Sequence, residues 1–308
     1  MTDRPPSPPE PAGPGAVSKV LVTGALGNVG APTVEALLAA GIGVRAADLS
    51  ADRAAARFPG VDTVRLDFND ESTFAAALDG CDALFLLRPP PISRVGPTLN
   101  VLVDRAARSG VRHVVFSSVA GAERNRIVPH HRVETHLRDS GLPWTMLRPG
   151  FFAQNLGDAY RADVVEDRRL YVPAGSGRVA FIDVRDLADI AAQVFSEPGR
   201  HAGHGYHLTG PAAVDFVQVA GLLTAELGTP IRYEPATIVG YARHLRSRGL
   251  PTSAVLVQTV LHAGLRRGDA EEVDPTVERL LGRPARTLER YIADHVELWS
   301  APRRSAAT

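Results

Sequence analysis

Apolar residues in the first half of the chain gather in short runs that alternate with amphipathic stretches. The runs have the length of β-strands and lie at 20–22, 43–48, 61–66, 83–87, 111–117 and 144–147. The stretches between them space their apolar residues as α-helices do, at 33–40, 51–58, 72–78, 99–109 and 131–139. Strands that alternate with helices at this spacing need right-handed crossovers and a parallel sheet covered on both faces. The pattern predicts an α/β fold of the Rossmann type, with a doubly wound parallel sheet.

After Pro149 the alternation becomes irregular. Helical stretches at 184–195, 216–227 and 288–299 are separated by links rich in glycine and proline. This pattern predicts a smaller C-terminal α+β lobe. We therefore divide the chain into a disordered Pro-rich tail, a Rossmann domain and a substrate-binding lobe, at 1–17, 18–150 and 151–303.

Composition narrows the class of protein. The chain has 34 basic and 34 acidic residues and so no net charge, which is unlike a nucleic-acid-binding protein. No apolar run reaches the roughly 18 to 20 residues of a membrane span, and the N-terminus lacks the apolar core of a secretory signal. The single cysteine, Cys81, excludes a disulfide framework and fits a reducing compartment. These features predict a cytoplasmic protein without nucleic-acid or membrane partners.

A glycine-rich turn follows the first predicted strand, with glycines at 24, 27 and 30. In a strand–turn–helix context, Gly24 permits a tight turn, Gly27 lets the backbone approach a pyrophosphate, and Gly30 lets helix and strand pack closely. Asp48 ends the second predicted strand, where a carboxylate accepts hydrogen bonds from the adenosine ribose. The turn predicts a dinucleotide site, whose residues here are Gly24, Leu26, Gly27, Asn28, Val29, Gly30, Asp48 and Leu49.

The glycine spacing resembles that of the extended and atypical short-chain dehydrogenases. Six further segments resemble the NmrA-like family, at 114–122, 131–134, 140–152, 180–186, 208–211 and 281–284. That family includes NAD(P)H-dependent quinone and azo-dye reductases, and also NAD(P)-binding regulators without demonstrated turnover. The resemblance implies adenine beside Asp67 and Phe68. It also implies a cofactor flanked by Leu87, Arg88 and Pro89, with Pro149, Gly150 and Phe151 at the nicotinamide. The structural alternatives are a solvated loop acid for Asp67 and core packing for Phe151 and Phe152.

The Tyr-x-x-x-Lys pair of classical short-chain dehydrogenases is missing. Lys19 is the only lysine, and the first tyrosine is Tyr160. By alignment the tyrosine position falls on Ile127 and the lysine position on His131. This departure argues against standard ketone reduction and against a nucleotide-sugar epimerase, which needs the same acid–base pair.

Other side chains are then candidates for contacts with the reacting groups. His131 is a candidate for the nicotinamide ribose or a proton, because histidine titrates near neutral pH. Ser117 and Ser118 close the fifth strand and are candidates for a substrate oxygen. His130 is a weaker candidate, whose alternative role is a pair with Glu134 on the helix surface.

The prediction is an NAD(P)H-dependent reductase of a planar, quinone-like or aromatic acceptor, which can take a hydride without a strong acid. Phe151, Phe152 and Phe181 would line its pocket, with Asn155 as a polar contact. The alternative is a dinucleotide-sensing regulator that does not turn over. Asp48 would repel a 2′-phosphate, and Leu49 stands where NADPH-using relatives often carry arginine, so NAD(H) is preferred and NADP(H) is the alternative.

Two other sequence patterns, one of histidines and one of arginines, are not interpreted as binding sites. His201, His204 and His207 recur at every third residue, but without a carboxylate at fixed spacing, so no metal site is predicted. The arginines at 243–248 and the pair Arg266 and Arg267 are interpreted as solvated helix ends. A homodimer is left open.

Overall fold

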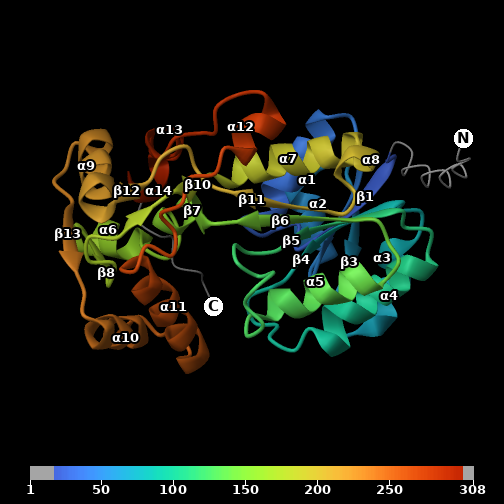
Figure 1. Ribbon diagram of the computed structural model, residues 1–308, viewed down its shortest axis with the longest axis horizontal. Coiled ribbons are helices and arrows are strands. Elements are labelled where there is room, and N and C mark those ends of the chain that lie inside the picture. The colour runs from blue at the N-terminus through green and yellow to red at the C-terminus, as the bar shows by residue number, and fades with distance from the viewer. Residues whose placement is uncertain (1–16, 301–308) are drawn as a thin grey trace, which may run out of the picture. The chain divides into compact units, whose positions relative to one another are not determined.

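The computed structural model describes residues 17–300, so the predicted tail lies outside the described residues apart from Val17. The chain forms two compact units (Figure 1). Within the described range, the first unit comprises 17–118, 122–146 and 191–205, and the second comprises 119–121, 147–190 and 206–300.

A seven-stranded sheet has the order β11-β6-β5-β4-β1-β2-β3. Its strands are β1 (Lys19–Thr23), β2 (Gly43–Asp48), β3 (Asp62–Arg65), β4 (Ala83–Leu87), β5 (His113–Ser117), β6 (Trp144–Pro149) and β11 (His204–Leu208). β1 pairs in parallel with β2 and β4, and parallel pairing continues to β3 and β5. The strand order reverses at β1, which confirms the predicted doubly wound sheet of the Rossmann type.

Helices cover both faces of this sheet. They are α1 (Gly30–Ala39), α2 (Ala51–Arg57), α3 (Phe74–Leu78), α4 (Val101–Arg108), α5 (Pro129–Asp139), α7 (Val184–Ser196) and α8 (Pro198–His201), with short helical turns η1 (Glu71–Thr73) and η2 (Gly96–Asn100). In Figure 1, α3, α4 and α5 lie on one side of the sheet and α1 on the other. Leu84 and Leu86 pack with α3, α4 and α5 in one apolar cluster, because alternate side chains of a strand point to the same face.

The second unit is built of short strand pairs and helices. β7 (Phe151–Phe152) pairs with β10 (Phe181–Ile182), β8 (Arg169–Val172) with β13 (Arg232–Pro235), and β9 (Arg178–Val179) with β12 (Val214–Asp215). The helices are η3 (Ala153–Leu156), α6 (Arg161–Asp167), α9 (Phe216–Leu227), α10 (Ile238–Ser247), α11 (Thr252–Leu265), α12 (Thr276–Leu281), α13 (Leu288–Asp294) and α14 (Glu297–Ser300). Buried aromatic rings, among them Tyr160, Phe216 and Trp299, form the centre of its core.

A buried carboxylate joins distant segments of the second unit. Asp186, at the start of α7, is fully buried and accepts hydrogen bonds from the Arg283 guanidinium at 2.9 Å and the Arg286 backbone N–H at 2.7 Å. The Arg286 guanidinium also donates to it. These contacts connect the segments 180–186 and 281–284, both of which the sequence analysis singled out.

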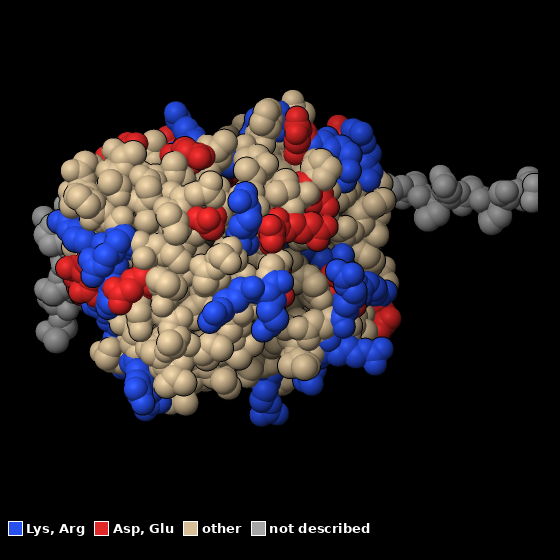
Figure 2. Space-filling view, turned by 60° about the vertical axis from the view of Figure 1, so that its left-hand side comes forward, with Lys and Arg blue, Asp and Glu red and all other residues tan. Residues whose placement is uncertain are grey.

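None of the described helices is long and apolar enough to cross a membrane. On the face of the molecule shown in Figure 2, acidic and basic side chains are interspersed among uncharged residues. No continuous basic stripe forms on that face within the described part of the chain. The charge distribution therefore adds nothing in favour of a nucleic-acid partner.

Candidate active site

The glycine loop between β1 and α1 has the geometry that its sequence predicts. Gly24 has a φ of +61°, which favours glycine, and its carbonyl accepts the Gly27 N–H at 2.9 Å. A Cβ at Gly30 would lie 2.0 Å from the Gly24 carbonyl oxygen, so only glycine fits there. A Cβ at Gly27 would lie 3.3 Å from the same oxygen, and Gly27 is exposed. The loop itself thus requires Gly24 and Gly30, whereas Gly27 leaves its backbone open to a ligand.

Asp48 ties this loop to the tip of β2. Its carboxylate accepts the Leu26 N–H at 3.1 Å and the Leu49 N–H at 2.8 Å. A carboxylate has about four acceptor positions, so two remain for ribose hydroxyls. The Leu49 side chain is exposed.

Just after β3, the two residues expected beside adenine have different surroundings. The half-buried Asp67 carboxylate accepts the Asn69 N–H at 3.0 Å and an Arg65 N–H at 3.2 Å. The Phe68 ring packs in the apolar cluster of the first unit and is 6% exposed. The Phe68 ring therefore offers little surface to an adenine.

At the end of β4, Leu87 contacts the glycine loop, and the next residue, Arg88, donates a hydrogen bond to a histidine. The Leu87 Cδ1 lies 3.5 Å from the position of a Cβ on Gly24, and the Leu87 N–H donates to Thr23 Oγ1 at 2.9 Å. Arg88 Nε donates to His130 Nε2 at 3.2 Å. Burial and the Arg88 charge lower the pKa of His130 to about 3. His130 is thus a neutral hydrogen-bond acceptor at neutral pH, with Arg88 as its partner.

The two serines at the end of β5 differ in their partners. Ser118 donates its hydroxyl hydrogen to Glu134 Oε1 at 2.7 Å, and Glu134 is fully buried. Glu134 Oε2 accepts Arg138 at 2.8 Å. The Ser117 hydroxyl has no hydrogen bond to another described residue. Ser117 is therefore the serine whose hydrogen is available to a ligand, and the sequence had not suggested a buried role for Glu134.

His131, on the first turn of α5, has a defined tautomer. Its Nδ1 lies 2.8 Å from the Ala122 carbonyl oxygen, which can only accept, so Nδ1 carries the hydrogen. In the neutral ring Nε2 is then an acceptor. The ring is half-buried. A neutral His131 can accept a hydrogen bond from a hydroxyl, but it donates from Nε2 only when it is protonated.

In the second unit, Phe151 is half-buried and Phe181 is not available to a ligand. The Phe151 ring packs edge-on against Phe181 at 5.6 Å and against His262 at 5.7 Å between ring centroids. Phe181 is 2% exposed and also packs on Phe216. This placement corrects its predicted role, since Phe181 supports Phe151 from the core and does not line a pocket. Gly150 donates its N–H to the Leu208 carbonyl at 2.9 Å.

A buried tyrosine–histidine pair lies behind Phe151. His262 Nδ1 donates to the Gln258 carbonyl at 2.7 Å, so the Tyr160 hydroxyl donates to His262 Nε2. Burial lowers the pKa of His262 to about 4 and raises that of Tyr160. Nothing in the sequence pattern indicated this pair, because 102 positions separate its members.

The regularly spaced histidines have separate surroundings. His201 is buried, and His204 Nδ1 donates to the Ala202 carbonyl at 3.0 Å. The ligand atoms of His207, Glu272 and Asp274 lie within 4.8 Å of one another. Exposed acidic groups often lie this close together without a metal ion, so we assign no metal to this cluster.

Comparison with known proteins places the chain in a family. The sequence profile of the NmrA-like family matches residues 16–296. The chain belongs to this family. Among its NmrA-like relatives, the NAD(P)H azoreductase of Xenophilus azovorans is 33% identical, over 92% of this chain and 99% of the relative. Quinone oxidoreductase 2 of Escherichia coli is 27% identical, over 89% of this chain and 97% of the relative.

Solved structures agree with this NmrA-like fold. The NADPH complex of quinone oxidoreductase 2 from Escherichia coli superimposes with a TM-score of 0.80 and 27% identity, covering 90% of this chain and 99% of that chain. The triphenylmethane reductase of Citrobacter sp. superimposes with a TM-score of 0.79 at 23% identity, covering 91% and 99%. The second likeness shows the fold alone.

Proposed function

We propose that this NmrA-like protein is an NAD(P)H-dependent oxidoreductase that reduces a planar conjugated acceptor, such as a quinone or an azo compound. The observation that carries the proposal is the glycine loop. Its conformation requires glycine at 24 and 30, whereas the backbone at Gly27 is left accessible to a ligand. Relatives named as an azoreductase and a quinone oxidoreductase, matched over nearly their whole length, support the reaction class. The dinucleotide, when bound, supplies the hydride.

The available side chains favour an acceptor that needs no strong acid. His130 is neutral, Ser118 donates its hydrogen to Glu134, and the Nδ1–H of His131 donates to the Ala122 carbonyl. A simple ketone becomes an alkoxide that needs a proton at once. A quinone that accepts a hydride delocalises the negative charge over the ring, so water can supply the second hydrogen as a proton. We infer that His131 accepts a hydrogen bond from the nicotinamide ribose and that Ser117 contacts an acceptor oxygen.

For the acceptor itself, the second unit offers three half-buried side chains, Phe151, Phe152 and Asn155. Two aromatic rings and one amide would suit a flat ligand with a polar substituent.

We assign the cofactor to the glycine loop, Asp48 and the segment from Leu87 to Pro89. The nicotinamide end is assigned to the segment from Pro149 to Phe151.

A dinucleotide-sensing regulator is the second candidate, because neither His130 nor Ser118 is free to act as an acid. Stopped-flow absorbance with NADH or NADPH and a panel of quinones separates the two functions. Oxidation of one dinucleotide for each quinone reduced is expected of the reductase. Tight dinucleotide binding without consumption, across the panel, would favour the regulator instead.

Removing the His131 side chain should weaken cofactor binding more than catalysis. For His131→Ala we expect kcat with quinones to fall by less than about tenfold, whereas loss of a general acid costs about 10²- to 10⁴-fold. The measurements are dinucleotide affinity and the rates of quinone and ketone reduction between pH 5 and 9. His136→Ala, on the same helix, is the control. Fast ketone reduction that collapses in His131→Ala would instead identify His131 as the acid.

Asp48 should make the protein prefer NADH over NADPH. Its carboxylate repels a 2′-phosphate, whereas it accepts hydrogen bonds from ribose hydroxyls. Because Asp48 also accepts the Leu26 N–H, Asp48→Ala would loosen the loop as well. Asp48→Asn keeps an acceptor oxygen, and we expect it to lower the ratio of NADH to NADPH affinity by about tenfold, or about 1.4 kcal/mol. Calorimetric titration measures this ratio. Equal or tighter binding of NADPH by the unmodified protein would contradict the preference.

A further inference from the structure

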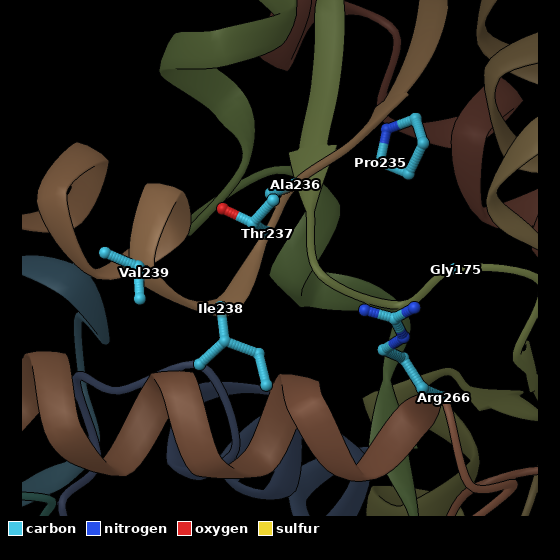
Figure 3. A pocket seen from close by; sticks show the side chains of 7 residues that line it. All are labelled: Gly175, Pro235, Ala236, Thr237, Ile238, Val239 and Arg266. Atoms are coloured by element: carbon cyan, nitrogen blue, oxygen red, sulfur yellow. The ribbon is translucent and has the colours of Figure 1, made fainter.

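The second unit contains an open cavity of about 460 Å³ (Figure 3). It lies where β13 leads into α10 and where α11 ends, and its walls include Gly175, Pro235, Ala236, Ile238, Val239 and Arg266. Cavities of about 300 to 1,000 Å³ hold small organic ligands. All of its lining residues belong to one unit, so its form does not depend on the other unit.

Apolar side chains form most of this wall. Ile238 is 48% exposed and Val239 is 60% exposed, although both are large and apolar. Covering such surface releases about 25 cal/mol for each Å² removed from water. The wall is therefore suited to the apolar body of a ligand.

Arg266 supplies a positive charge at this cavity. In Figure 3 its guanidinium lies beside Gly175, and Ile238 and Val239 lie on the other side of the space. A Cβ at Gly175 would lie 3.2 Å from Arg266 Nε, and the φ of +57° at Gly175 also favours glycine. The absence of a side chain at Gly175 thus makes room for the guanidinium.

The charge of Arg266 is not neutralised by a neighbouring acid. Arg267 pairs with Asp269 at 3.0 Å, whereas Arg266 forms no ion pair with any described residue. A guanidinium presents a planar set of donors that matches a carboxylate or a phosphate. The two arginines, which the sequence analysis treated alike as solvated helix ends, therefore differ.

We propose that this cavity binds a small organic anion, a carboxylate or phosphate ester with an apolar body. The anionic group pairs with Arg266, and the apolar body covers Ile238 and Val239. This site shares no residue with the proposed dinucleotide site and does not depend on the proposed reductase function.

The test is calorimetric titration of the full chain with octyl phosphate below its micelle concentration. Binding of one molecule is expected, with octanol and inorganic phosphate each binding much more weakly. Arg266→Gln should weaken octyl phosphate by about tenfold or more, the value of one charge-assisted hydrogen bond. Arg267→Gln is the matched control and should bind as the unmodified chain does. Val239→Ser should weaken octyl phosphate but leave inorganic phosphate unchanged.

Three results would overturn the proposal. The first is equal affinity in Arg266→Gln, or an equal loss in both arginine variants, which would indicate general attraction to positive charge. The second is loss of octyl phosphate binding in Gly27→Val, which would place the phosphate on the glycine loop. The third is sedimentation with phosphatidic acid vesicles, but not phosphatidylcholine vesicles, that requires Arg266, which would identify a lipid surface as the partner.

Discussion

Gly27→Val is expected to lower the affinity for NADH and NADPH by at least about 100-fold, or about 2.8 kcal/mol. The new side chain would occupy the space in which the exposed backbone of the loop meets the pyrophosphate. Its Cβ would lie 3.3 Å from the Gly24 carbonyl oxygen, a close contact that a small shift relieves. The thermal midpoint of unfolding should therefore change little. Calorimetric titration and thermal unfolding together measure the two effects.

Gly30→Ala gives the contrasting result. Its Cβ would lie 2.0 Å from the Gly24 carbonyl oxygen, so α1 and the loop must move apart. We expect this smaller substitution to lower the thermal midpoint as well as the affinity. Unchanged dinucleotide affinity in Gly27→Val would refute the assignment of the loop.

Asp186→Asn should destabilise the second unit by about 1 to 3 kcal/mol. Asp186 is fully buried against Arg283 and Arg286. An amide at this position accepts more weakly than the carboxylate, and a hydrogen bond to a charged group contributes about 1.5 to 3 kcal/mol. The two arginines are 37% and 27% exposed and keep Asp189 as a partner, which limits the loss. Denaturant unfolding followed by circular dichroism measures the change in the free energy of unfolding.

Asp189 provides a matched control, since it contacts the same two arginines from a position with a side chain 36% exposed. We expect Asp189→Asn to cost less than about 1 kcal/mol, as exposed ion pairs do. Equal losses in the two variants would show that burial of Asp186 is not what makes the cluster stabilising.

The sheet was predictable because its signals are local. Apolar runs of strand length appear in the sequence, and each helix between them packs on the adjacent sheet. The starts of the helices were less accurate. α1 begins at Gly30 and α5 at Pro129, before the predicted positions 33 and 131. Pro32 and Pro129 lie in the first turns of these helices, where proline is accommodated because its missing N–H would have no partner there.

In the candidate site, too, local features were predictable from the sequence and contacts between distant segments were not. The tight turn at Gly24, the close packing at Gly30 and the place of Asp48 at the end of β2 were predictable from spacing alone, whereas their role in binding a dinucleotide stays a prediction. The partners of the side chains were not, because they come from distant segments. Arg88 and His130 are 42 positions apart, and Ser118 and Glu134 are 16 apart. Phe181 belongs to a run of apolar residues, and periodicity alone does not tell a ring in the core from a ring beside a ligand.

The path of the chain limits how this protein can be recombined. β6, α7 and β11 each have residues in both units, so the backbone passes from one unit to the other several times. A single crossover point between two homologous genes therefore cannot exchange one unit whole. A fragment that stops after β6 would also lack β11, the neighbour of β6 in the sheet. An uncovered strand edge of this kind recruits other chains. A chimaera that exchanges the second unit whole must transplant the segments 119–121, 147–190 and 206–300 together.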